Sequence, residues 1–213
     1  MAKSKRGPTA LDLLALGGIA ALVVVLVLPR LSGLKIDHNE RDAVHALSIL
    51  HQRLTALRND RRGVDPTERT PLSRLLRPDA DGRPPLDDCE LSKSSDGTEL
   101  LVRHGYVIRI DYAEAPLDQD GLRPFDICAV PLSYGETGSL AYAVTHGREL
   151  LRSRNLARRY DVSNPPSEGA FRPLRRDQAA KEKEKAVPTD TVKGAYDALD
   201  GTQWEVIDWP AQP

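Results

Sequence analysis

The chain has 213 residues, a formal net charge of −1 at pH 7, and 29% charged residues. This near-neutral balance excludes the strongly basic field that a general nucleic acid binding protein needs, so we predict no nucleic acid partner. The length allows one N-terminal segment and one domain of ordinary size, and an aromatic content of 5% predicts a small, aliphatic core.

The N-terminal stretch from Leu11 to Leu28 has one charged residue, Asp12, and otherwise only Leu, Ala, Val, Ile and Gly. As a helix these residues reach about 27 Å, close to the hydrocarbon thickness of a bilayer. The sequence therefore predicts a transmembrane helix over residues 8–29. The basic residues in 1–7 indicate a leader or a cytoplasmic flank. Together they predict a single-pass protein of the bacterial inner membrane, with its later residues in the periplasm or on the cell exterior.

Residues 30–60 show a second helical pattern. Apolar residues recur at four-three-four-three spacing and predict one seam of an amphipathic helix: Ala43, Leu47, Leu50, Leu54 and Leu57. Polar residues are predicted on the opposite face: Arg41, Asp42, Gln52, Arg53 and Arg58. If Pro29 and Gly33 only bend the chain, residues 8–58 form one long rod. The alternative is an anchor, a short linker and the first helix of a separate domain.

Residues 61–154 are predicted to form a loop followed by an antiparallel sheet. The part from 64 to 95 is rich in Pro, Asp, Arg and Ser, and indicates a connecting loop with one short helical turn near Leu72. Strands are predicted at 99–102, 106–112, 125–132, 140–144 and 148–151. Strict alternation in the second of these places Tyr106 and Ile108 on one face and Arg109 on the other.

Residues 155–213 are charged and poor in apolar residues, so we predict a largely disordered tail. Residues 189–199 have a weak helical pattern. Trp204 and Trp209 near the end have two interpretations: a short docking motif, or aromatic residues that pack back on the domain.

Two cysteines, Cys89 and Cys128, lie 39 positions apart. In an oxidising compartment the sequence predicts one structural disulfide between them, the alternative being a thiol or metal pair. We find no catalytic constellation, no phosphate loop and no metal-ligand spacing. The prediction is a protein without enzymatic activity, cofactor or metal.

Gly7 follows Lys5 and Arg6, and Asp12 and Pro29 stand at fixed distances after it. With these residues the start of the chain resembles type IV prepilins and the pseudopilins of type II secretion, which have a short basic leader that ends in Gly. Asp12 stands five positions after Gly7, where the family has Glu, and Pro29 stands where the family often has a helix-kinking proline. Pro8 departs from the family, which has a hydrophobic residue after the scissile bond. The sequence leaves open whether the Gly7–Pro8 bond is cleaved.

The resemblance implies an α+β fold, in which a long N-terminal membrane-spanning helix packs on a small antiparallel β-sheet. It implies a structural subunit of a pilin-like filament or secretion pseudopilus, assembled with like subunits through the N-terminal helix in a lipid bilayer. Asp12 and Pro29 would serve this assembly, Asp12 by pairing with the freed N-terminal amine of a neighbour. The alternative is a single-pass membrane-anchored periplasmic interaction module that does not polymerise.

Overall fold

The computed structural model describes residues 10–60, 69–94, 97–112, 123–156, 158–166, 195–197 and 201–210. Between residues 10 and 31 it describes the backbone and only some of the side chains. The predicted leader of residues 1–7, with Gly7, and the neighbouring Pro8 lie outside the described residues.

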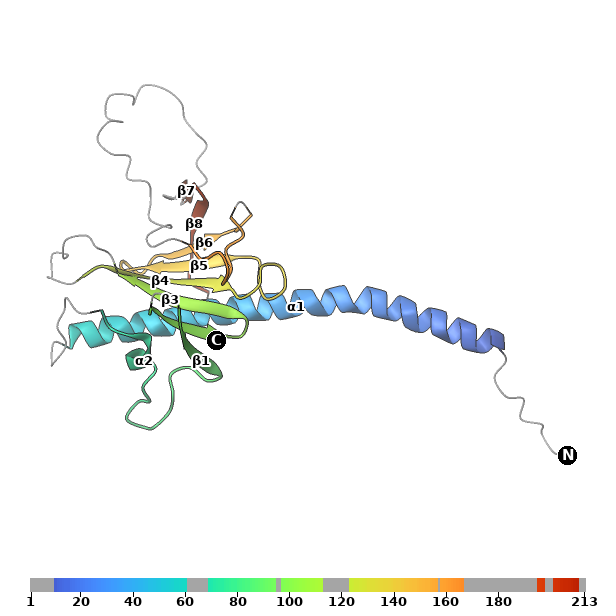
Figure 1. Cartoon of the computed structure of the whole chain (residues 1–213), viewed down its shortest axis with the longest axis horizontal. Coiled ribbons are helices and arrows are strands. Elements are labelled where there is room, and N and C mark those ends of the chain that lie inside the picture. The colour runs from blue at the N-terminus through green and yellow to red at the C-terminus, as the bar shows by residue number, and fades with distance from the viewer. Residues whose placement is uncertain are drawn as a thin grey trace, which may run out of the picture.

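One long helix, α1 (Ala10–Asn59), dominates the molecule. It runs through Pro29 and Gly33 without interruption. Its second half lies against a β-sheet, and its first half extends away from the sheet as a projecting rod (Figure 1). We call the projecting residues 10–38 the stem, and the sheet with the packed half of α1 the head.

The prediction of a transmembrane helix over residues 8–29 is contradicted. Within the part of the chain that the structure describes, no helix is both long enough and apolar enough to cross a membrane. From Ser32 to Asn59, where every side chain of α1 is described, the helix carries charged residues such as Lys35, Asp37 and Glu40. A charge within the hydrocarbon layer is costly. The single-pass inner-membrane location, which rested on that helix, is corrected with it.

The head contains one antiparallel sheet of eight strands in the order β1-β2-β3-β4-β5-β6-β8-β7. The strands are β1 (Cys89–Lys93), β2 (Glu99–Arg103), β3 (Tyr106–Tyr112), β4 (Phe125–Pro131), β5 (Ala141–Thr145), β6 (Leu150–Ser153), β7 (Ala195–Asp197) and β8 (Gln203–Ile207). A short helix, α2 (Leu72–Leu75), lies next to β2 and α1. Neighbours in sequence pair along most of the sheet, and only the last two strands reverse that order.

The two faces of the sheet have separate cores. The apolar seam of α1 packs on β3, β4 and β5, and its residues Leu47, Leu50 and Leu54 are completely buried. The alternation predicted for β3 is confirmed, because Tyr106 and Ile108 join this helix-facing core. The opposite face has a smaller cluster that includes Val107, Cys128, Leu151 and Trp204.

The predicted fold class is wrong in its membrane-spanning helix, in the extent of its sheet and in its tail. Strand β1 lies in the stretch predicted to be a loop, and β7 and β8 lie in the tail predicted to be disordered. Residues 195–197 form a strand where the sequence indicated a weak helix. The reason is long-range pairing: β8 hydrogen-bonds to β6, about 50 residues earlier, and local composition does not show such a partner. The rest of the predicted tail, 167–194, lies outside the described residues.

Candidate functional site at the junction of stem and head

The stem exposes large apolar side chains to solvent. Those described as exposed are Leu14, Leu16, Ile19, Leu22, Val25 and Leu34. Leu14 is 74% exposed and Val25 70% exposed, whereas every apolar residue of the α1 seam between Ala43 and Leu54 is buried. Exposed apolar side chains in this number on one segment are typical of an interaction surface.

These side chains do not share one face of the stem. At about 100° per residue, the positions from Leu14 to Leu34 spread over roughly half of the helix circumference. A single helical partner would cover one narrow stripe, whereas a helix that is apolar on several sides becomes buried among several neighbours. Among the described residues, the exposed apolar surface of the stem is thus wider than the stripe that one helical partner would cover.

Three polar residues of α1 attach the helix to the head just where the stem ends. Asn39 Nδ2 donates a hydrogen bond of 2.8 Å to the carbonyl oxygen of Thr137. One carboxylate oxygen of Glu40 accepts hydrogen bonds of 3.0 Å from the backbone N–H of Ser139 and 3.0 Å from its hydroxyl. Both contacts reach the loop between β4 and β5. This loop is thereby fixed to the helix by polar groups at one level of its axis.

Asp42 makes the third attachment, to the turn between β2 and β3. Its two carboxylate oxygens accept hydrogen bonds from Arg103 Nε at 2.7 Å and Nη2 at 3.0 Å, a bidentate pair. The Nδ1 atom of His104 lies 2.9 Å from the same carboxylate. Burial raises the pKa of Asp42, but the hydrogen bonds and positive charges of Arg103 and His104 outweigh it and lower that pKa below its usual value.

We call these three residues and the turns that they hold the collar: Asn39, Glu40 and Asp42, with residues 103–105 and 137–140. The sequence placed Asp42 on the solvent face of the helix, and the structure corrects this, because the Asp42 side chain is only 13% exposed. The missed signal is the group of polar residues directly before the apolar seam begins at Ala43. Their partners lie 61 to 100 residues away in the chain, and spacing cannot identify them.

Close backbone approach in the collar requires glycine at two positions. Gly105 has φ +78°, and a Cβ there would lie 2.7 Å from the Cβ of Thr137. A Cβ on Gly138 would overlap the ring of Tyr106, whose hydroxyl donates a 3.0 Å hydrogen bond to the carbonyl oxygen of Leu140. The two turns therefore interlock around Tyr106 with no spare space.

The structure does not test the roles of the two predicted assembly residues, Asp12 and Pro29. Asp12 and Pro29 belong to α1, but their side chains lie outside the described residues. What the structure adds is their position: both are on the stem, beyond the collar, so neither belongs to the head.

The expected disulfide between Cys89 and Cys128 is not formed, and both cysteines are free. Cys89 lies in β1 at the edge of the sheet and packs against the helix-facing core, whereas Cys128 lies in β4 within the core of the opposite face. Two strands, β2 and β3, lie between them, and they face opposite sides of the sheet. Complete burial raises the pKa of the Cys128 thiol to about 12, which keeps it protonated at neutral pH.

Trp204 packs on the domain, which is one of the two interpretations of the tryptophans. Its side chain is completely buried in β8, and its indole N–H donates a 3.0 Å hydrogen bond to Thr202 Oγ1. Trp209 is partly buried, and its indole N–H donates to the carbonyl oxygen of Arg148 at 3.1 Å. Trp204 is thus not available as a docking residue.

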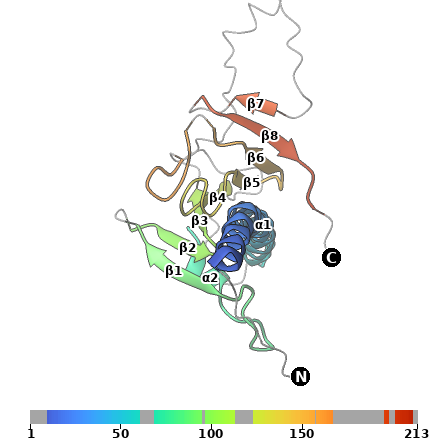
Figure 2. The same ribbon diagram turned by 90° about the vertical axis from the view of Figure 1, so that its right-hand side faces the viewer.

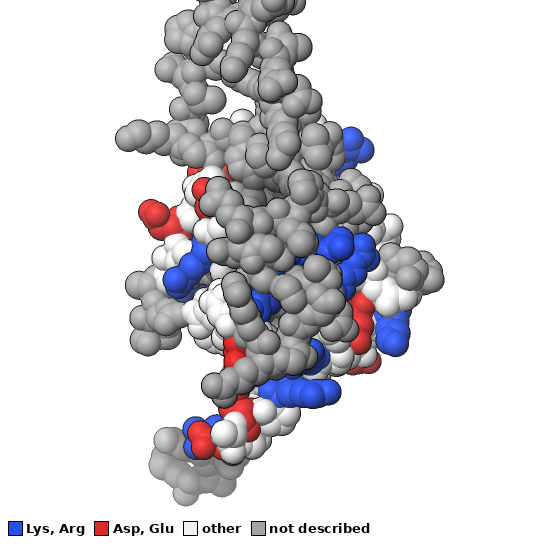
Figure 3. All heavy atoms as spheres, turned by 90° about the vertical axis from the view of Figure 1, so that its left-hand side faces the viewer, with Lys and Arg blue, Asp and Glu red and all other residues white. Residues whose placement is uncertain are grey.

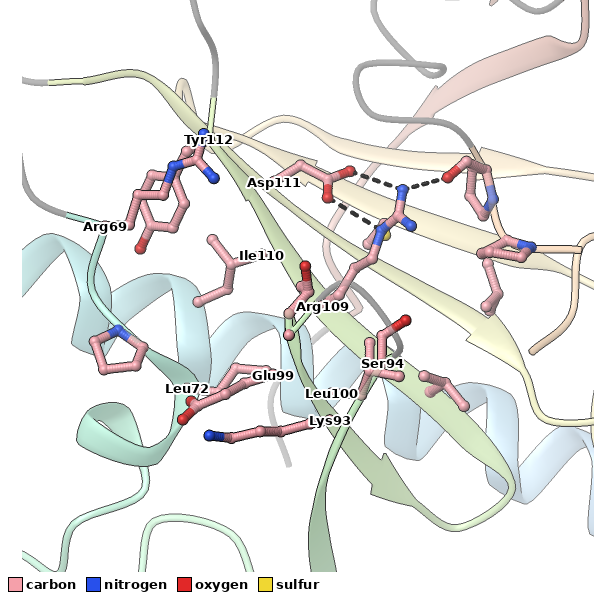
Figure 4. Close-up of a pocket in the computed structure, with 18 of the residues that line it drawn as sticks. Arg69, Leu72, Lys93, Ser94, Glu99, Leu100, Arg109, Ile110, Asp111 and Tyr112 are labelled. Atoms are coloured by element: carbon pink, nitrogen blue, oxygen red, sulfur yellow. Dashed lines mark hydrogen bonds and ion pairs between the residues drawn. The ribbon is translucent and has the colours of Figure 1, made fainter. Parts of the chain in front are cut away.

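A cavity of about 520 Å³ opens on the face of the sheet away from α1 (Figure 4). Arg109 crosses its floor and bonds to Asp111 and to the carbonyl oxygen of Pro166. At its rim, Glu99 accepts hydrogen bonds from the backbone N–H and the hydroxyl of Ser73. Arg109 is thus paired with Asp111, and Glu99 with Ser73, while two further basic residues, Arg69 and Lys93, also line the cavity.

At the end of the head where α1 ends, positive and negative groups lie side by side among the described residues (Figure 3). No group of three or more His, Cys, Asp or Glu residues in the described chain could hold a metal ion.

Comparison with known proteins adds no relative. No protein-family model, no curated protein and no solved structure matches the chain. The stem and the collar are therefore the features that bear on its function.

Proposed function

We propose that this chain is a structural subunit of a pilin-like filament or secretion pseudopilus, in which copies assemble by packing their stems together. The observation that carries the proposal is the stem itself: large apolar side chains cover roughly half the circumference of a helix that no other described part of the chain covers. The resemblance of residues 7–29 to prepilins points to the same class of assembly.

The energetics favour burial of the stem by other copies. Burying a large aliphatic side chain contributes about 2 kcal/mol, so a few such side chains per subunit offset the several kcal/mol lost when two molecules associate. Because the described apolar side chains cover roughly half of the stem circumference, each stem has enough apolar surface to contact more than one neighbour. An assembly that continues through every copy is a filament, whereas a single self-complementary stripe would stop at a dimer.

The collar suits this role because it fixes the direction of the stem relative to the head. Three side chains within one turn of α1 bind two separate turns of the sheet. A stem held in this way cannot swivel against its head. Each copy therefore presents its head at the same angle, which a regular filament requires.

The experiment compares the full chain with a stem variant that carries Ile19→Gln and Leu22→Gln. The matched control is Val162→Gln, which makes the same kind of change at an exposed apolar position of the head, 43% exposed. We expect filaments or defined oligomers of the full chain and the control in electron microscopy and analytical ultracentrifugation, and monomers of the stem variant. A full chain that stays monomeric at high concentration would instead favour an interaction module that does not polymerise.

A second measurement addresses Asp12. Mass spectrometry of the mature protein reports whether the chain begins after Gly7. A chain cleaved there, together with loss of assembly in Asp12→Ala, supports pairing of Asp12 with a freed amine. A mature chain that still carries the leader removes that role from Asp12 and leaves packing of the stems untouched.

A further inference from the structure

We propose that the head binds a small organic carboxylate with an apolar body, in the cavity of about 520 Å³ where β2 and β3 separate. Charge at the rim holds the carboxylate, and apolar side chains inside the cavity hold the body. The site lies on the head, away from the stem, and does not depend on the proposed assembly.

The cavity arises because two neighbouring strands of the sheet diverge. Residues 101–103 of β2 pair with residues 106–108 of β3, and the pairing stops there. Beyond that point residues 99 and 100 pair with β1 alone, and residues 109–112 pair with β4 alone. In the view along α1, β1 and β2 lie next to α2 at one end of the curved sheet (Figure 2). The opening is thus a consequence of how the strands pair.

Apolar side chains form the inside of the cavity. It is lined by Val107, Ile110 and Val130 from the sheet and by Leu72 from α2. Each of these side chains is at most 8% exposed, so the packing around them fixes the apolar wall before a ligand arrives. A preformed apolar wall favours an apolar ligand body, and pockets of roughly 300–1,000 Å³ are the size that small molecules occupy.

Most of the charged groups in the walls already have partners. Arg109 is paired with Asp111 through Nε at 3.0 Å and Nη2 at 3.1 Å (Figure 4). Both carboxylate oxygens of Glu99 accept hydrogen bonds from Ser73, at 2.9 Å and 3.0 Å. These pairs hold the walls in place and leave little of their charge for a ligand.

Two basic side chains that line the cavity differ from these pairs. Arg69 and Lys93 are exposed, and neither forms a hydrogen bond or an ion pair with another residue that the structure describes. Arg69 lies beside the Tyr112 ring, and Lys93 extends from β1 on another side of the cavity (Figure 4). Two cations without a counter-ion at the rim of an apolar cavity attract an anion.

The balance of charge selects a monoanion. The cavity is lined by three basic residues and two acidic ones, an excess of one positive charge: Arg69, Lys93 and Arg109 against Glu99 and Asp111. A monocarboxylate compensates this excess. A phosphate dianion would add a further negative charge beside two carboxylates, and like charges in contact are unfavourable. The planar guanidinium of Arg69 also matches the geometry of a carboxylate.

The experiment uses 4-phenylbutyrate as the probe, because it joins one carboxylate to an apolar body. Equilibrium dialysis against the full chain measures binding to single molecules and to assemblies alike. We expect a Kd of about 0.1–1 mM, which is ordinary for a ligand of this size. The neutral 4-phenylbutanamide and inorganic phosphate should each bind at least about tenfold more weakly, because one lacks the charge and the other lacks the apolar body.

Variants locate the binding on the cavity. Arg69→Gln and Lys93→Gln should weaken binding of the probe about threefold each and about tenfold together, as expected for exposed charges. The matched control carries Lys35→Gln and Arg41→Gln, which remove the same charges from exposed positions of α1 that do not line the cavity, and it should keep the wild-type Kd. Val162→Asp, at a cavity-lining position that is 43% exposed, adds a negative charge and should also weaken binding. Circular dichroism checks that every variant folds.

Several results would overturn the site. These are no binding of the probe below about 10 mM, equal binding of the amide, tighter binding of phosphate, or equal loss in the double variant and its control. The stem variant with Ile19→Gln and Leu22→Gln should bind the probe as the wild type does. Loss of binding in this variant would place the probe on the stem and overturn the cavity as its site. A full chain that stays monomeric and still binds the probe keeps the carboxylate site and overturns only the filament.

Discussion

The two halves of α1 form one continuous helix but differ in how their apolar side chains are buried. The half in the head hides one apolar seam under the sheet and uses polar residues at the collar to hold two turns. The stem shows exposed apolar side chains over roughly half of its circumference and meets no other described part of the chain. The difference teaches that apolar content alone does not tell whether a helix is buried within its own chain.

The largest expected effect is a difference in the free energy of unfolding between substitutions in the two halves of α1. Leu50→Ala removes a completely buried side chain from the seam and should lower the free energy of unfolding by about 2–5 kcal/mol, through lost burial and the cavity left behind. Leu22→Ala, at a position that is 63% exposed on the stem, should change it by less than about 0.5 kcal/mol. Urea unfolding, at protein concentrations too low for assembly, measures the free energy of unfolding of both variants. Equal effects would mean that the stem folds back on the head.

The next largest change in stability is expected at the collar. Asp42→Ala leaves the guanidinium of Arg103, whose side chain is 10% exposed, without its bidentate partner and should cost about 3 kcal/mol. The control is Arg41→Ala on the exposed side of the same turn, which should be nearly silent. Because the folded-state pKa of Asp42 is lowered, its contribution is complete above the unfolded value of about 3.9 and is lost as the pH falls through the lower folded value. A wild-type chain that keeps full stability at pH 2 would contradict the role of this pair.

Two glycine substitutions, one in the head and one in the stem, extend the comparison of the two halves of α1. Gly138→Ala forces a Cβ into the Tyr106 ring and should destabilise the head by about 1–3 kcal/mol. Gly17→Ala on the stem meets no neighbour within 4 Å, and should stabilise α1 by about 0.5–1 kcal/mol through helix propensity. Thermal unfolding of the two variants should therefore shift in opposite directions, and a shift in the same direction would be inconsistent with an open stem.

The smallest effect concerns His51 on the buried side of α1. Burial against Phe125 lowers the pKa of His51, so the folded protein resists its protonation while the unfolded chain takes up a proton near pH 6.5. Stability should be complete above pH 6.5 and should decline as the pH falls toward the folded pKa. His51→Gln should flatten this decline, whereas His45→Gln, on the exposed side, should preserve it. Parallel pH profiles for both variants would assign the decline to other groups.

The sequence by itself determined the local elements. Period-3.6 spacing from Ala43 to Leu54 identified the seam of α1, and strict alternation identified β3, because a repeated pattern within one segment is enough to reveal which face is buried. The continuity of apolar residues before Pro29 identified a helix. It also led to the wrong prediction of a transmembrane span, since a run of apolar residues does not by itself show that a helix lies in lipid.

Only the tertiary structure decided the rest. The pairing of β8 with β6, the burial of Trp204 and the separation of the two cysteines depend on which distant segments meet. The collar is of the same kind, because Asp42 reads as a solvent-facing charge until the fold brings Arg103 to it from 61 residues away. Such contacts follow from how the sheet closes over the helix, and no local pattern of the chain records that closure.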